Sequence, residues 1–171
     1  MTASTMTEPE TATLPRSAPR SLARLAAVQA LYQLDITGAD VNAVIAEFAE
    51  HRLGQAIEGA DTGPADDVFF SDIVTGVVRD QRAIDPSLHA TLAAGWRLAR
   101  IDSILRAILR SAAYELSHRP DIPAKVVIAE YIDVAHAFFE GDEPKVVNGI
   151  LDRLAHQIRG DELGPGVSED E

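Results

Sequence analysis

The most constraining pattern in the chain lies in residues 101–116, where apolar side chains recur every three or four positions. They are Ile101, Ile104, Leu105, Ile108, Leu109, Ala112 and Leu116. An α-helix has about 3.6 residues per turn, so this spacing places all of them along one helix face. Such a face must be buried against other elements of the fold. The segment therefore predicts a packed helical core.

The other periodic segments predict an all-α chain, a compact bundle of about seven helices. Besides the helix that starts near residue 101, helices are predicted over 19–37, from Asp40, over 66–82, from Asp85, from Pro123 and through 147–158. A helix is expected to begin at Asp85, because Asp85 suits an N-cap and Pro86 the first helical position, and it is expected to be short. No strictly alternating run or tight hairpin signal predicts a strand.

Composition divides the chain into one helical domain and two tails. Residues 1–18 are rich in Thr, Pro, Ala and Ser, and residues 160–171 are acidic. Both tails are predicted to be disordered, because they hold little apolar bulk. The helical domain spans 19–159, which is long enough to bury its own core.

Two breaks predict a further division of the helical domain. One is the Gly-rich loop at 54–65, and the other is the turn at Asp85. We therefore expect a first part of three helices, residues 19–84, packed against a second part of four helices, residues 85–159.

Charge is unevenly distributed along this chain, whose formal net charge is -12. Residues 35–78 hold nine acidic side chains and one basic side chain, whereas residues 79–125 hold eight basic and five acidic ones. Residues 11–34 hold three arginines and no acid. Binding follows local fields more than totals, so the acidic total does not exclude a negatively charged partner such as RNA.

The residue types required by several kinds of chemistry are missing or scattered. The chain has no cysteine, which excludes disulfides and thiolate catalysis. Its five histidines show no metal-ligand spacing, and neither a phosphate-binding loop motif nor a nucleophile motif occurs. We therefore expect a non-catalytic protein with no metal or cofactor. No apolar run approaches the ~20 residues of a membrane span, so the expected location is the cytoplasm and no membrane partner is expected.

Arginines occur at four-residue intervals around the start of the first predicted helix, at positions 16, 20 and 24. A cation near a helix N-terminus opposes the helix dipole by a few tenths of a kcal/mol to ~1 kcal/mol. An anionic ligand would offset this cost. A solvated helix start fits the spacing equally well.

The start of the last long helix carries a second set of polar residues. Lys145 and Asn148 lie there, where free backbone N–H groups can meet phosphates. Gly149 costs ~1 kcal/mol relative to alanine inside a helix. The close approach of another helix is the expected reason for this glycine.

Four arginines surround the start of the fifth predicted helix. Arg106 and Arg110 share one helix face, and Arg97 and Arg100 precede them. Asp102 lies four residues before Arg106, so an ion pair within the helix would explain part of this basic face.

Four strings in the chain resemble the NusB family of bacterial transcription antitermination factors. They are ARLAAVQALYQLDITG, FFSDIVTGVV, RAILRSAAYELSHRPDIPAKVVIAEYIDVAHAF and PKVVNGILDRL. The resemblance runs from about Pro19 to Arg159 in the order of the family. It implies an all-helical fold of two helical subdomains and no catalysis.

The resemblance also implies partners and the residues that contact them. NusB-like proteins bind the boxA element of nascent RNA together with NusE, a ribosomal small-subunit protein. The pair then helps RNA polymerase, with other Nus factors, to resist termination, notably on ribosomal RNA operons. The RNA-binding residues expected in this chain are Arg20, Arg24, Asp142, Lys145, Val146 and Asn148. The partner-binding residues expected are Tyr32, Leu105, Arg106 and Arg110.

Three positions depart from the family pattern. The consecutive arginines often found in the family are missing beside Arg20. Val146 stands where an aromatic ring could stack on a base, which forgoes ~1–3 kcal/mol. Leu105 stands where an acid is common. We therefore expect weak RNA binding by this chain alone and tighter binding with NusE.

Two alternative functions are carried beside the main one. The chain could be a NusB-like accessory domain associated with RNA modification, although the absence of cysteine disfavours the methyltransferases that carry such domains. It could also be a self-associating homodimer whose RNA-binding face is covered, since some family members dimerise.

Overall fold

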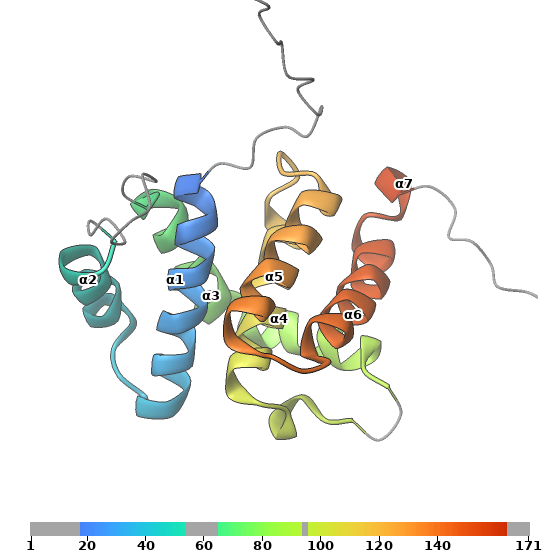
Figure 1. Ribbon diagram of the computed structural model, residues 1–171, viewed down its shortest axis with the longest axis horizontal. Helices are drawn as coiled ribbons and strands as arrows, with labels where there is room; N and C mark the ends of the chain where they lie inside the picture. Colours follow the sequence, from blue (N-terminus) through green and yellow to red (C-terminus); the bar gives the residue numbers. More distant parts are fainter. Residues whose placement is uncertain (1–17, 54–64, 94–95, 164–171) are drawn as a thin grey trace, which may run out of the picture.

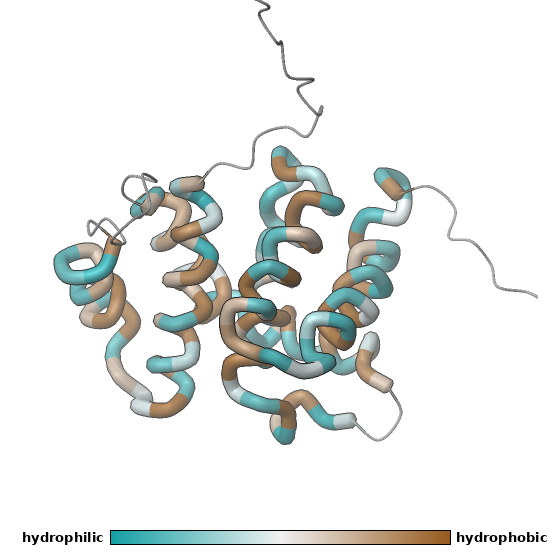
Figure 2. The backbone as a smooth tube through the Cα atoms, in the orientation of Figure 1, coloured by the Kyte–Doolittle hydropathy of each residue, from teal (hydrophilic) through white to brown (hydrophobic). Residues whose placement is uncertain are grey.

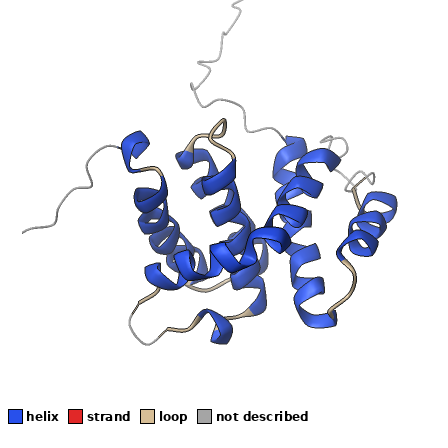
Figure 3. Cartoon of the chain, turned by 180° about the vertical axis from the view of Figure 1, so that it is seen from behind, coloured by secondary structure: helices blue, strands red, loops and turns tan. Residues whose placement is uncertain are grey.

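The computed structural model describes residues 18–53, 65–93 and 96–163 (Figure 1). They form α1 (Ala18–Thr37), α2 (Val41–His51), α3 (Asp67–Thr91), the 3-10 helix η1 (Leu98–Arg100), α4 (Ser103–His118), α5 (Ala124–Phe138), α6 (Glu143–Ile158) and α7 (Gly160–Leu163). No strand occurs among them, as Figure 3 shows from behind. The prediction of an all-α fold with about seven helices is confirmed.

The predicted junction between the first two helices is confirmed by its caps. Gly38 has a φ of 64° and its N–H donates to the carbonyl of Leu34 at 2.9 Å, which ends α1. Glycine adopts this left-handed conformation at no steric cost. Asp40 then caps α2, because its carboxylate accepts the N–H of Ala43 at 3.1 Å.

The helix break predicted at Asp85 is wrong, because α3 continues through Pro86. Ile84 and Leu88 are buried and extend the apolar face of the preceding turns. This packing holds the helix together across a proline that cannot donate an N–H. The carboxylate of Asp85 caps no helix, since it accepts two hydrogen bonds from Arg110 of α4. Two predicted helices are therefore one.

The predicted tails can be compared with the structure only in part. Residues 1–17 and 164–171 lie outside the described residues. The expectation of disorder from residue 160 is wrong for Gly160–Leu163, which form α7. The carboxylate of Glu162 accepts the N–H of Ala124 at 2.7 Å, and this contact anchors the acidic turn to the start of α5.

The predicted division into 19–84 and 85–159 stays a prediction. Its boundary falls inside α3, so no helix break marks it. The Gly-rich loop expected at 54–65 lies outside the described residues except for Ala65.

The core lies between α1, α2, α3, α4, α5 and α6, with α4 in contact with α1, α3, α5 and α6. Figure 2 shows hydrophobic and hydrophilic residues alternating along each of these helices, as expected where one helix face is buried. The closest approach involves Gly76 of α3, because a Cβ at this position would lie 2.1 Å from the ring of Tyr114 on α4. Only glycine leaves room for this ring.

Helices α1 and α5 run from the top of Figure 1 to the bottom, and α4 and α6 run back, which gives the bundle two ends. The upper end holds the start of α1, the end of α4, the start of α5 and the end of α6 with α7. The lower end holds the end of α1, η1, the start of α4, the end of α5 and the start of α6. With 16 residues, α6 separates the two ends by about 24 Å.

Candidate functional site

Arg24, predicted to bind RNA, lies in the core with 2% of its surface exposed. Its Nε and Nη2 donate to the two carboxylate oxygens of Glu115 at 2.9 to 3.2 Å. Glu130 lies 3.7 Å from its Nη1. Burial lowers the pKa of Arg24, but the hydrogen bonds and charge of Glu115 outweigh burial and raise it. The guanidinium is therefore closed to an RNA phosphate in this structure.

The network around Arg24 joins three helices. The hydroxyl of Tyr131 on α5 donates to Glu115 of α4, and the hydroxyl of Ser21 on α1 donates to Glu130 at 2.9 Å. Burial raises the pKa of Tyr131 well above its ordinary value, and the charge of Glu115 adds to this. Removing one partner from such a buried pair leaves a charge uncompensated. The network is thus part of the core of the bundle.

Arg20, the other predicted RNA contact on α1, reaches the surface at the upper end. Its side chain is 37% exposed, and its Nε lies 3.9 Å from Asp66. Its guanidinium carbon lies 4.9 Å from the ring centre of Phe69, and Arg119 lies over the same ring at 5.2 Å. Arg119 also donates twice to Asp121 at 3.0 Å, and this lowers the pKa of the Asp121 carboxyl. Carboxylates therefore already balance this arginine cluster.

Arg159, which the sequence does not single out, completes the upper end. Its guanidinium donates to the carbonyls of Glu115, Leu116 and Arg119 at 2.7 to 3.0 Å, and also to the carbonyl of Ile122. The last carbonyls of a helix have no partner within the helix. From just beyond the end of α6, Arg159 supplies such a partner for the carbonyl of Leu116 and a second donor for that of Glu115.

The predicted RNA contacts at the start of α6 lie at the lower end. Lys145 and Asn148 are exposed three residues apart on one helix face, and Lys145 forms no ion pair within the described residues. Val146 is half-buried against the core. Asp142 is exposed, and its carbonyl accepts the N–H groups of Lys145 and Val146 at 3.0 and 3.2 Å. Side chains, more than free backbone N–H groups, are therefore open to a ligand here.

The close approach of another helix, expected as the reason for a glycine at position 149, is not seen among the described residues. A Cβ at this position would meet only Nη1 of Arg153, at 3.7 Å. No neighbouring helix approaches it within the described residues, so the expected close approach is wrong.

Tyr32, predicted to contact a protein partner, lies on an open groove. Its side chain is 37% exposed beside a groove of about 440 Å³ between α1, α4 and α5. Ile36, Ile104 and Phe138 give this groove an apolar wall. Leu105, also predicted to contact the partner, is only 5% exposed and does not line the groove. Sequence reasoning missed the apolar wall because three separate helices supply it.

Arg106 and Arg110, the remaining predicted partner contacts, are bound within the chain. Arg106 donates to Asp35 at the end of α1, and Arg110 donates to Asp85 at 2.8 and 2.9 Å. The ion pair expected between Asp102 and Arg106 does not form. Asp102 instead caps α4, where its carboxylate accepts two backbone N–H groups. A charge pattern along one helix does not reveal partners that come from other helices.

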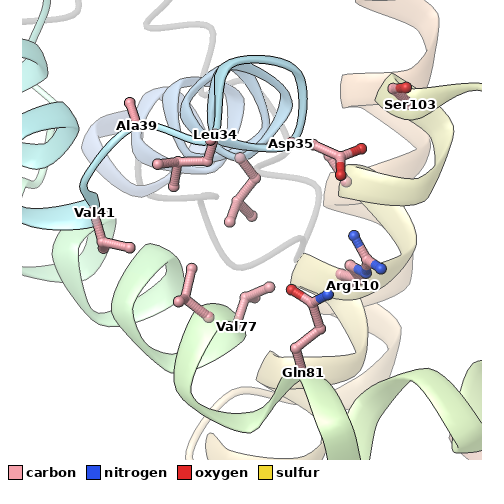
Figure 4. A pocket seen from close by; sticks show the side chains of 12 residues that line it. Leu34, Asp35, Ala39, Val41, Val77, Gln81, Ser103 and Arg110 are labelled. Atoms are coloured by element: carbon pink, nitrogen blue, oxygen red, sulfur yellow. The ribbon is translucent and has the colours of Figure 1, made fainter.

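These two arginines line a cleft of about 900 Å³ between α3, η1 and α4. His89 and Arg97 form another part of its wall. A smaller hollow of about 260 Å³ shares Asp35 and Arg110 with the cleft. In Figure 4 its apolar side chains lie on the left and its polar ones on the right.

The described residues offer neither a metal site nor a membrane-spanning helix. No cluster of three or more histidine or acidic side chains there could hold a metal ion. None of the described helices has the length and apolar character that a membrane crossing needs.

Comparison with known proteins places this arrangement in a family. The model of the NusB family matches residues 21–156. The chain belongs to the NusB family. This membership assigns it to transcription antitermination, and NusB proteins of this kind are not enzymes.

Two relatives are similar over most of their length. The transcription antitermination protein NusB of Bradyrhizobium sp. (strain ORS 278) is 60% identical over 146 residues, which cover 85% of this chain and 87% of the relative. That of Rhodopseudomonas palustris (strain BisB18) is 56% identical over 147 residues, which cover 86% and 87%.

Solved structures of NusB proteins share the fold. T. maritima NusB has a TM-score of 0.68 at 29% identity and covers 85% of this chain and 96% of its own. A crystal structure of antitermination factors NusB and NusE in complex with double-stranded RNA has a TM-score of 0.66 at 23% identity and covers 83% and 99%. This second likeness concerns the fold alone.

Proposed function

We propose that this chain binds boxA RNA together with NusE, as a non-catalytic adaptor that supports processive transcription, notably of ribosomal RNA operons. It would act in the RNA polymerase antitermination complex with other Nus factors, and therefore in the cytoplasm. One observation carries the proposal: the groove around Tyr32 and the exposed face of Lys145 and Asn148 share the lower end of the bundle.

The groove suits a protein partner. Tyrosine joins a large apolar ring to a polar hydroxyl, and such residues are enriched where proteins meet. Tyr32 stands beside Ile36, which is 58% exposed. Covering these side chains removes apolar surface from water. We therefore assign NusE to the groove.

The first turns of α6 suit RNA. Lys145 has no carboxylate partner among residues 18–53, 65–93 and 96–163 to release before it meets a phosphate, and the amide of Asn148 can donate to a phosphate or base on the same face. Asp142 and Val146 border this face. Arg20 is a weaker candidate at the upper end, because it must exchange Asp66 for a phosphate. Arg24, Leu105, Arg106 and Arg110 lie outside this proposed surface because they are buried or bound within the chain.

The acidic total charge explains why two proteins are needed. Phosphate contacts depend on Lys and Arg, and their contribution weakens with salt. A chain of net charge -12 that offers few unpaired cations binds RNA weakly alone. A partner seated in the neighbouring groove can extend the basic surface along the same strand.

Anisotropy of a labelled boxA RNA tests the proposal. The chain alone is expected to bind weakly, whereas chain and NusE together bind tightly and prefer boxA over a scrambled RNA of equal length. Measurement over a salt series should show the affinity falling as salt rises. Equal binding of both RNAs by the mixture would refute the proposal.

A second candidate is a homodimer with a covered RNA face. The exposed groove around Tyr32 and Ile36 favours it, because a second copy could cover the same apolar side chains. Light scattering over a dilution series separates the two candidates. A dimer that persists on addition of NusE and RNA would favour the second.

A further inference from the structure

We propose that residues 96–100, which lie between α3 and α4, are an additional contact for single-stranded RNA. Among them, Trp96 stacks on a base while Arg97 and Arg100 bind phosphates. This inference rests on the proposed function, because it extends the RNA contact at the start of α6 to a neighbouring part of the lower end. It adds three residues to those that the sequence singles out for RNA.

Trp96 is the only tryptophan in the chain, and 44% of it is exposed. A tryptophan ring that is buried removes a large apolar area from water and so stabilises a core. Trp96 keeps part of this area exposed and does not give the fold that full stabilisation. Its backbone N–H donates to the carbonyl of Ala93 at 3.0 Å, which ties the backbone of Trp96 to the residues after α3. An exposed aromatic ring is a stacking platform that accepts any base.

Arg97 and Arg100 lie directly after this ring, on either side of η1. The N–H of Arg100 donates to the carbonyl of Arg97 at 2.9 Å, so the turn fixes their spacing. Both side chains are exposed, and neither forms an ion pair within the described residues. They can therefore meet phosphates without first giving up a carboxylate.

Arg97 also lines the cleft of about 900 Å³, which is large enough for a nucleotide. Three arginines on its wall, Arg97, Arg106 and Arg110, outnumber the two aspartates there. Arg110 binds Asp85 through Nε and Nη2, and its Nη1 makes no hydrogen bond within the described residues. The cleft is thus locally positive in an acidic protein.

The position of residues 96–100 suits a strand that already contacts α6. The carbonyl of Thr91, at the end of α3, accepts a hydrogen bond from Arg153 of α6 at 3.1 Å. Lys145 lies eight residues before Arg153, about 12 Å along the same helix. Residues 96–100 also supply the ring that Val146 lacks. These residues and the start of α6 thus lie at the same end of the bundle, where one strand could contact both.

Tryptophan fluorescence tests this contact directly, because Trp96 is the only source of such emission in the chain. Titration of boxA RNA into the chain with NusE should quench the emission over the same concentrations at which anisotropy rises. NusE alone should leave the emission unchanged.

Three other results would overturn this inference, and each has a different consequence for the proposed function. Tight RNA binding without any change in emission would overturn this inference and leave the proposed function standing. A change with NusE alone, and none on adding RNA, would overturn it by assigning Trp96 to the protein partner. Failure of anisotropy to detect boxA binding would refute the proposed function and this inference together.

Substitutions test the roles separately. Trp96→Ala should weaken boxA binding by about fivefold or more, and Trp96→Phe should retain most of the affinity. Arg97→Glu should weaken binding and reduce the salt slope by about 1. Lys125→Glu, at an exposed position of the upper end, is the matched charge control. Equal affinities for the Ala and Phe variants, or equal effects of Arg97→Glu and Lys125→Glu, would overturn the inference in variants whose circular dichroism matches the parent.

Discussion

Cations serve different purposes at the two ends of the bundle. At the upper end, Arg20, Arg119 and Arg159 each lie beside a carboxylate. At the lower end, Arg100 and Lys145 are exposed, and neither forms an ion pair within the described residues. An RNA-binding surface is therefore not located by counting basic residues. It is located by asking which of them already have a partner.

This difference has a physical basis. A phosphate that binds a paired arginine must displace a carboxylate, whereas an unpaired cation gives up only water. The upper-end arginines also hold helices together, since Arg119, directly after α4, binds Asp72 of α3, and Arg159, directly after α6, donates to the carbonyl of Leu116 in α4. Ion pairs between helices also occur at the lower end, where Arg106 of α4 binds Asp35 of α1, so it is the unpaired cations of that end that are suited to binding.

The largest expected effect comes from the buried network. Arg24→Met should lower the free energy of unfolding by about 3–5 kcal/mol, because it leaves Glu115 buried without its partner. Urea unfolding followed by circular dichroism measures this. Arg20→Met is the control and should cost no more than ~1 kcal/mol. A stable Arg24→Met variant that binds RNA poorly would break the comparison and return Arg24 to the RNA surface.

The chain has two lysines, one at each end, and they form a natural matched pair. Lys145→Glu should weaken boxA binding by the chain with NusE about tenfold and reduce the salt slope by about 1. Lys125→Glu, in the first turn of α5, should change the affinity little. Acetylation followed by mass spectrometry should show Lys145 protected by RNA and Lys125 not. Equal protection of the two would erase the distinction between the ends.

The substitution Gly149→Ala tests whether the glycine within α6 lowers the stability of the fold. Gly149→Ala should raise the free energy of unfolding by about 0.5–1 kcal/mol, because alanine is the better helix former and its Cβ meets nothing closer than 3.7 Å. Thermal unfolding checks the sign. A lower melting temperature would mean that the helix needs this glycine for its own packing.

Glu162 gives the smallest effect, at the upper end. Its hydrogen bond from Ala124 lowers its pKa, so it stabilises the fold fully above the ordinary pKa of glutamate. This stabilisation disappears as the pH falls through the lowered value. Glu162→Gln should therefore cost a few tenths of a kcal/mol at neutral pH and nothing in acid. A difference in melting temperature that persists in acid would contradict this assignment.

The sequence predicts most of the helices because their signals are local. The periodicity of α4, Gly38 after α1 and Asp40 before α2 depend on neighbours a few residues away. The helix break at Asp85 was wrong because Arg110, 25 residues later, binds its carboxylate. Local cap signals cannot include such a distant partner.

The candidate site is less predictable for the same reason. The motif that contains Tyr32 leads to the groove, but Ile104 and Phe138 come from other helices. In the sequence, Arg24 belongs to a basic helix start that could bind RNA. In the structure it binds Glu115, which is 91 residues away in the chain. Burial and ion pairing are properties of the assembled bundle.

The position of Arg159 has a consequence for how the protein is made. The carbonyl of Leu116 accepts a hydrogen bond from Arg159, which is synthesised 43 residues later. A nascent polypeptide leaving the ribosome can form α4 early, but its C-terminal turn stays open to water until the final long helix emerges. Completion of the domain is thus tied to the last stage of translation.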